Sequence, residues 1–114
     1  MAARLEAQAV LVAADPAPVG FASLRADGYL DFLFVHPDRT GEGIARRLVA
    51  AVEAIAMAQG LTRLTTLASD VARPVLEHMG WQAGAENHVE KQGILLRNWP
   101  MLRVLTAGEE LSRV

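Results

Sequence analysis

A glycine-rich junction is the segment of this sequence with the clearest capacity for chemistry. Residues 35–45 read VHPDRTGEGIA and join an apolar run to a helical pattern. A glycine loop that leads into a helix presents backbone amides without intrahelical partners at the positive end of the helix dipole, which suits phosphate. Gly41 and Gly43 would let the backbone approach such a ligand closely. The junction predicts a phosphate cradle, and the alternative is a tight turn that only begins a helix.

Two common phosphate loops do not fit these residues. A Walker loop ends in Gly-Lys followed by Ser or Thr, and residues 35–45 contain no lysine. The dinucleotide fingerprint needs a third glycine further along and an acid that closes a second strand, and neither is present in the required place. A phosphate ligand would therefore have to be held in another way.

The elements before and after the junction must position it. Three apolar runs bounded by turn residues predict an antiparallel meander, at residues 8–14, 19–24 and 29–35. A helix is predicted from Gly43 to about Gln59, because its apolar residues recur on one face. Gly60 then ends the helix.

The second half of the chain predicts further strands and one more helix. We expect a strand over residues 61–68, a short helix from Ser69 or Asp70 to Met79, and two strands between Trp81 and about Val104. The two last strands would flank the polar segment 86–93. A helix between two strands implies parallel pairing at some point in the sheet. The order is β-β-β-α-β-α-β-β, a mixed α/β (α+β) fold in one domain of residues 1–114.

Composition narrows the classes of function. The net charge is -2 and the basic residues are scattered, so nothing favours a nucleic-acid or anionic-membrane partner. The chain has no cysteine, which excludes disulfides and thiolate metal ligands, and its three histidines lack metal-ligand spacing. No run approaches the roughly 20 apolar residues that span a bilayer. We expect a cytoplasmic protein without a metal site.

Two segments together resemble the motifs of the GNAT (GCN5-related N-acetyltransferase) superfamily. That family has Val-x-Pro followed by Gln/Arg-x-x-Gly-x-Gly/Ala at a helix start, and here Val35, Pro37 and residues 40–45 match it. Its second segment, Asn-x-x-Ala-x-x-Phe-Tyr followed by Gly-Phe, is similar to residues 69–81 of this chain. The resemblance runs from about Val10 onward, and it implies a GNAT-like acyl-CoA acyltransferase fold.

The resemblance also implies a cosubstrate and a reaction. The loop amides would hold the pyrophosphate of acetyl-CoA, and the strand before the loop would pair with its pantetheine arm as an added strand would. The expected reaction moves the acetyl group to an amine of a small molecule or protein by direct attack. The residues expected to bind acetyl-CoA are Leu33, Phe34, Val35, Arg39, Thr40, Gly41, Glu42, Gly43, Ile44, Ala45, Arg46 and Ser69.

Catalytic residues are less clearly marked in the sequence. Asp31 is a candidate base, because it is an acid within an apolar strand, and the alternative is an outward-facing residue in solvent. Tyr29 lies two residues earlier, on the same face by strand alternation, and could donate a proton or wall the substrate. Leu76 stands where many members of the family have a tyrosine that protonates the departing thiolate. A catalytically weak or inactive acyl-CoA-binding module is therefore the alternative function.

A last expectation concerns assembly. The family usually begins with another strand and one or two helices, and the 114 residues leave no room for them. We expect the sheet to be left with a bare apolar face or edge, which natural folds avoid. A homodimer or a covering partner chain would then be needed.

Overall fold

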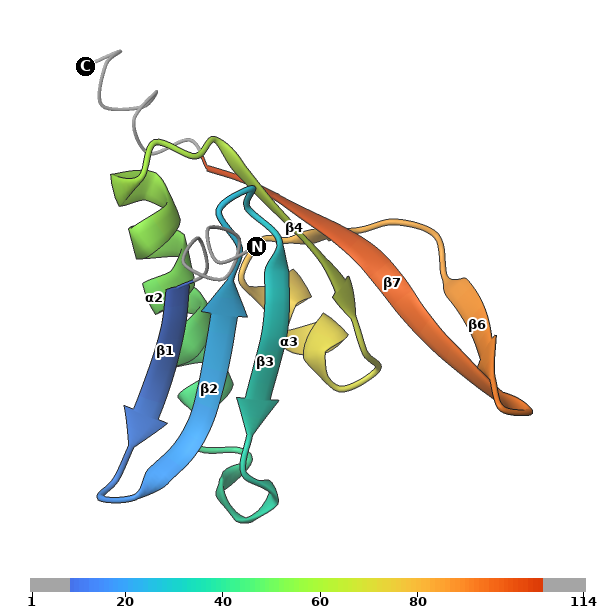
Figure 1. Cartoon of the computed structure of the whole chain (residues 1–114), viewed down its shortest axis with the longest axis horizontal. Coiled ribbons are helices and arrows are strands. Elements are labelled where there is room, and N and C mark those ends of the chain that lie inside the picture. The colour runs from blue at the N-terminus through green and yellow to red at the C-terminus, as the bar shows by residue number, and fades with distance from the viewer. Residues whose placement is uncertain (1–8, 106–114) are drawn as a thin grey trace, which may run out of the picture.

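Two antiparallel sheets and two α-helices make up residues 9–105, the part of the chain that the computed structural model describes (Figure 1). The first sheet has the order β1-β2-β3, formed by β1 (Ala9–Ala14), β2 (Pro18–Leu24) and β3 (Leu30–Val35). Both strand pairs are antiparallel, so the predicted meander is confirmed.

Helix α2 (Ile44–Ala58) covers one face of the first sheet. Its apolar stripe is buried at Ile44, Leu48, Val49, Val52 and Ala56. These side chains form one core with those of the sheet, and each fully buried leucine or valine contributes about 1.5–3 kcal/mol to folding. The helix ends at Ala58, followed by the C-cap Gln59 and by Gly60 with a φ of 82°, in agreement with the predicted end at Gly60.

The second sheet is built around one long strand. Strand β7 (Ile94–Val104) pairs antiparallel with β4 (Arg63–Ala68), with the short β5 (Gln82–Ala83) and with β6 (Asn87–Lys91). Helix α3 (Ala72–His78) follows β4. The mixed α/β fold class is confirmed, and the two helices fall where they were predicted.

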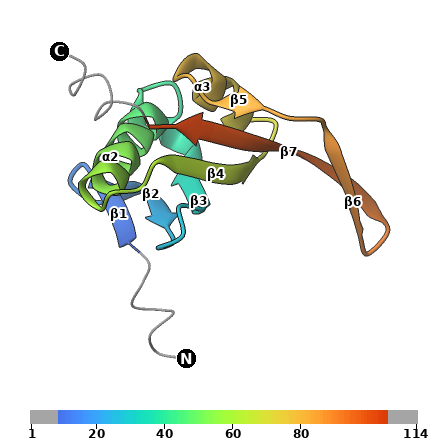
Figure 2. The same ribbon diagram turned by 90° about the horizontal axis from the view of Figure 1, so that it is seen from above.

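The segment from 81 to 104 holds one strand more than the sequence predicted. The polar segment 86–93, expected as a connection, contains β6 and the turn at Gln92 and Gly93. Its described side chains are exposed on both faces, so no alternation of apolar and polar residues marks the strand. Residues 87–98, which form β6 and the paired part of β7, project from the body as a hairpin arm (Figures 1 and 2).

The two sheets meet at one narrow point and then diverge. Tyr29 and Thr65 form an isolated parallel bridge, which confirms the predicted parallel pairing. Next to it the buried Thr66 hydroxyl donates to the Leu30 carbonyl at 2.7 Å. Beyond this point β3 is the end strand of its sheet, and within residues 9–105 no strand pairs with Leu33–Val35 on the side toward β4. A gap that separates β3 from β4 therefore opens beside the loop that leads to α2.

The face of the first sheet opposite α2 is apolar and exposed. It carries Val10, Val12, Phe21, Phe32 and Phe34, which are 38–63% exposed. The ring centroid of Phe21 lies 6.3 Å from that of Phe32 and 5.7 Å from that of Phe34. We call these five residues the outer face; within the described part of the chain, they match the expected bare apolar surface.

Candidate cofactor-binding site

The loop between β3 and α2 is shaped by local hydrogen bonds. The His36 amide donates to the Val19 carbonyl at 2.7 Å, which anchors the end of β3 to β2. The His36 Nδ1 accepts from the Asp38 amide at 3.1 Å and begins a single 3₁₀ turn, η1 (Pro37–Arg39). His36 thus has the structural turn role that its place before a proline suggests, and it aims the chain at the start of α2.

The two glycines of the loop are both required by its backbone. Gly41 has a φ of 82° and Gly43 a φ of 81°, values that side chains other than glycine rarely adopt. A Cβ atom at either position would meet nothing within 4 Å, so both positions border open space. The first amides of a helix have no intrahelical acceptor, and Gly43, at the N-cap of α2, provides no side-chain acceptor for them. This is the geometry of an anion cradle.

Arg39 forms ion pairs that hold the loop in place, and we call this set of contacts the Arg39 brace. Its Nε lies 2.9 Å from the Glu42 carboxylate, and one terminal nitrogen donates to Asp15 at 3.0 Å. The Glu42 carboxylate, followed by Asp15, raises the pKa of Arg39 above its ordinary value. Arg39 in turn lowers the pKa of Glu42. The guanidinium therefore ties the loop to the β1–β2 turn, and its expected contact with phosphate stays a prediction.

A pocket of about 500 Å³ opens beside this loop. One wall is β3, at Leu33, Phe34 and Val35, and the floor is the loop with the first turn of α2. Helix α3 and Ser69 form the opposite wall. The pocket lining includes every residue expected to bind acetyl-CoA except Glu42, whose carboxylate is turned to Arg39.

The wall from α3 is apolar. Ser69 was predicted to cap this helix; its Oγ accepts from the Ala72 amide at 3.2 Å, while the helix itself begins at Ala72 with Val71 at the N-cap position. Val71, Ala72 and Val75 line the pocket, whereas Leu76 is only 1% exposed and lies in the core. The sequence marked this segment as a motif but did not show which side chains face the pocket, since that depends on how α3 is rotated.

The two residues predicted to be catalytic do not line this pocket. Tyr29 precedes β3, and its ring lies under the Arg25 guanidinium, 4.8 Å from the ring centroid. Asp31 is half-buried on β3. The ladder with β2 shifts here, because Leu24 pairs with Leu30 while Ser23 pairs with Phe32, and this leaves Asp31 as the extra residue of a bulge. Such a bulge interrupts the alternation that would put Tyr29 and Asp31 on one face, and their catalytic roles stay predictions.

Within residues 9–105, no group of three or more histidine, aspartate or glutamate side chains is arranged to hold a metal ion. Over the same range, neither helix is long and apolar enough to cross a membrane. The pocket is lined by the loop with Arg39, Thr40 and Arg46, by Ser69 and by apolar side chains of β3 and α3.

Comparison with known proteins agrees with this fold. Residues 1–102 match the family described as "Acetyltransferase (GNAT) domain". A curated relative, the "Uncharacterized N-acetyltransferase YafP" of Escherichia coli K12, is 36% identical over 84 residues, which are 74% of this chain and 52% of that protein. The chain belongs to the GNAT acetyltransferase family, and it spans about half the length of this curated relative.

Solved structures show the same fold. A GCN5-related N-acetyltransferase from Rhodopseudomonas palustris is similar with a TM-score of 0.79 and 39% identity, over 91% of this chain and 66% of that one. The yncA protein of Salmonella typhimurium, a putative acetyltransferase solved with acetyl-CoA, gives a TM-score of 0.77 at 20% identity over 91% and 68%. The second likeness concerns the fold alone.

Proposed function

We propose that this chain is an acetyl-CoA-dependent N-acetyltransferase domain, and the observation that carries the proposal is the cradle beside the pocket. Open space over Gly41 and Gly43, at the start of a 15-residue helix, suits a pyrophosphate. The apolar walls from β3 and α3 suit the less polar arm of the same molecule. Acetyl-CoA bound to the similarly folded Salmonella protein supports this assignment.

The pocket residues form two groups, one for the pyrophosphate of acetyl-CoA and one for its pantetheine arm. The amides of residues 41–45 would bind the pyrophosphate, and Arg46, which lines the pocket and is exposed, would add positive charge. The edge of β3 at Leu33–Val35, with which no strand of residues 9–105 pairs on the side toward β4, would hydrogen-bond to the amide groups of pantetheine as an added strand does. When bound, acetyl-CoA supplies an acetyl group on a thioester that an unprotonated amine can take.

The chain must then accept a proton from the amine. We assign this role to Asp31, since it is an acid on the strand that walls the pocket, close to where β3 and β4 diverge. The apolar α3 wall, with Val75 at the pocket and Leu76 in the core, offers no hydroxyl group there. This wall is the observation that favours the alternative, a module that binds acetyl-CoA and transfers the acetyl group slowly or not at all.

Calorimetric titration with acetyl-CoA tests the cradle. Gly43→Glu puts a carboxylate where the pyrophosphate would lie, and we expect affinity to fall by about 100-fold, or about 2.7 kcal/mol. Gly60→Glu is the matched control, because Gly60 also has a positive φ of 82° and open space around it but lies outside the pocket. Equal affinity in the two variants would place the acetyl-CoA site elsewhere.

Release of free thiol from acetyl-CoA separates the two functions. Because the chain has no cysteine, every thiol that appears comes from CoA. Amine-dependent release identifies a transferase and also ranks small-molecule amines against peptide amines as acceptors. Tight binding without amine-dependent release across such a panel would leave the acyl-CoA-binding module.

Location and assembly complete the proposal. A cytoplasmic location would give the domain access to acetyl-CoA, which the reaction consumes. The exposed outer face, with Phe32 58% and Val10 63% exposed, supports a homodimer or a covering partner chain. The acceptor is proposed only as an amine.

A further inference from the structure

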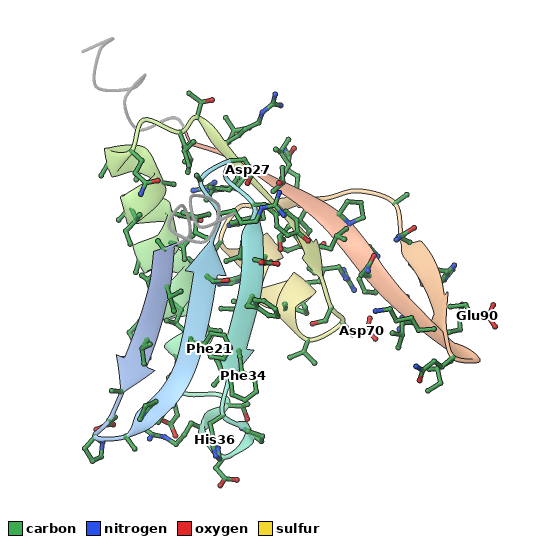
Figure 3. All side chains as sticks on the ribbon, viewed as in Figure 1. Phe21, Asp27, Phe34, His36, Asp70 and Glu90 are labelled. Atoms are coloured by element: carbon green, nitrogen blue, oxygen red, sulfur yellow. The ribbon has the colours of Figure 1, made fainter. Side chains whose placement is uncertain are left out.

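The outer face is hollowed where β1, β2 and β3 approach the α2 loop. A groove of about 380 Å³ is lined by Val10, Val12, Phe21, Phe34 and His36, together with neighbouring residues of β2. Figure 3 places Phe21 and Phe34 side by side on neighbouring strands, with His36 just beyond the end of β3. Exposure of an apolar groove to water is unfavourable, and another apolar surface that fills the groove lowers the free energy.

The hairpin arm carries a second exposed apolar surface. Ile94 is 61%, Leu95 66% and Leu96 48% exposed, and all three lie near the tip of the arm. Successive residues of a strand point to opposite faces, so the tip is apolar on both sides. The arm contributes little to the core of its own molecule, because the buried residues of β7 lie at its other end, around Met101. An uncovered apolar hairpin is a surface that natural sheets usually pair or cover.

The arm and the groove face the same side of the molecule. Figure 1 is viewed onto the outer face, with α2 behind the strands and the arm at the opposite end from β1. From above, the arm bends away from α3 toward the side on which β1, β2 and β3 lie (Figure 2). A two-fold axis in front of the outer face, roughly parallel to its strands, would bring the arm of a second copy in front of the groove.

We propose that two copies of this chain form an isologous dimer in which the arm tip of each copy packs into the outer-face groove of the other. A two-fold axis makes both contacts at once and closes the assembly. The arm tip carries Glu90 and Lys91, and Asp38, whose side chain is 87% exposed, lies beside His36 at the groove, so Lys91 can pair with Asp38 across the contact. The inference makes the proposed assembly specific and does not depend on acetyl transfer.

The dimer would also complete the candidate site. Phe34 lines both the outer-face groove and the cofactor pocket. A partner arm seated against Phe34 would therefore cover the exposed side of the strand whose edge is proposed to hold pantetheine. The second copy would supply part of the wall around the gap between β3 and β4.

Sedimentation of the whole chain at micromolar concentration tests the dimer. We expect a dimer for the original chain, and at least a tenfold weaker dimer for Leu95→Asp in the arm and for Val12→Asp in the groove. Met57→Asp is the matched control, because Met57 is 42% exposed on α2 and lies outside both surfaces. Circular dichroism and thermal melting check that each variant is folded. If Leu95→Asp is unfolded, Ile94→Asp replaces it, and if Val12→Asp is unfolded, Val10→Asp replaces it.

Engineered cross-linking gives the geometric test. The chain contains no cysteine, so Leu95→Cys and Val12→Cys copies can be mixed and oxidised without background. We expect a disulfide-linked dimer from this mixture and none from Leu95→Cys mixed with Met57→Cys. A monomeric original chain, a dimer that withstands both aspartate substitutions, or equal cross-linking in the two mixtures would each overturn the proposal. Acetyl-CoA binding that persists in Leu95→Asp would show that a failed dimer leaves the proposed function standing.

Discussion

Asp31 is the residue on which the proposed chemistry depends most. A carboxylate that takes the amine proton typically contributes 10²–10⁴-fold to a rate, while binding of the cosubstrate rests on other groups. Asp31→Asn keeps the size of the side chain and removes the base. We therefore expect acetyl-CoA affinity to stay within about twofold, and amine-dependent thiol release to fall by about 100-fold or more.

The pH profile distinguishes a base at Asp31 from a structural role. A general base makes the rate of transfer depend on pH, so Asp31→Asn should change the shape of the profile. Asp27→Asn is a useful control, because Asp27 is an exposed acid of the preceding turn and pairs with Arg25. A profile that keeps its shape in Asp31→Asn would assign the proton to another group.

Among the elements, the loop from Pro37 to Gly43 is the proposed binding site, and Arg39 links it to Glu42 and Asp15. Arg39→Gln removes the charge that holds both Glu42 and Asp15, and it leaves the Glu42 carboxylate without its cation beside the cradle. We expect acetyl-CoA affinity to fall about tenfold, or about 1.4 kcal/mol, by calorimetry. Arg63→Gln, an exposed arginine at the start of β4 and outside the pocket, should leave affinity unchanged.

The stability that the Arg39–Glu42 ion pair adds to the fold depends on pH. Arg39 lowers the pKa of Glu42 in the folded chain, so its stabilising effect is complete above the ordinary carboxyl pKa. The effect is lost as the pH falls through the lowered pKa. The melting temperatures of the original chain and Arg39→Gln should therefore converge in acid and separate toward neutral pH. A difference that is the same at every pH would mean that the brace does not act through the ionised Glu42.

Several elements could be predicted because their signals are local. Helix α2 has a regular apolar stripe ended by Gly60, and the glycines at 41 and 43 each stand where the backbone has a positive φ. The twelve residues expected to bind acetyl-CoA came from the resemblance to a family, and the pocket brings eleven of them together. Local pattern and motif therefore predict the glycine loop and the elements beside it.

Other features depend on contacts that a sequence does not display. Strand β6 forms because residues 87–91 pair with β7, although their composition predicts a loop. The bulge at Asp31 follows from the register of β2 against β3, and the rotation of α3 puts Val75 at the pocket and Leu76 in the core. The Arg39 brace joins residues 24 positions apart, at Asp15 and Arg39. In each case the local sequence allows several arrangements, and contacts between residues far apart in the sequence determine which one forms.

At the scale of the whole molecule, assembly and cofactor binding should be coupled through Phe34. This residue borders both the groove that would receive a partner arm and the pocket that would receive acetyl-CoA. If the arm fixes the outer side of β3, the dimer binds acetyl-CoA more tightly than the monomer does. Coupling between two binding equilibria is reciprocal, so acetyl-CoA must then strengthen the dimer by the same factor for each site. We expect about a fivefold effect, at the low end of the usual range of coupling between sites.

Two independent measurements check this equality. The dissociation constant of the dimer is measured by sedimentation without acetyl-CoA and at saturating acetyl-CoA. A dimer has two acetyl-CoA sites, so the square root of the ratio of these two constants gives the coupling factor for each site. The affinity for acetyl-CoA is measured by calorimetry on the dimer and on monomeric Leu95→Asp. Val12→Asp provides a second monomer whose pocket lining is unchanged. Equal acetyl-CoA affinity in dimer and monomers, with a dimer constant that acetyl-CoA does not move, would show that the two surfaces of β3 act separately.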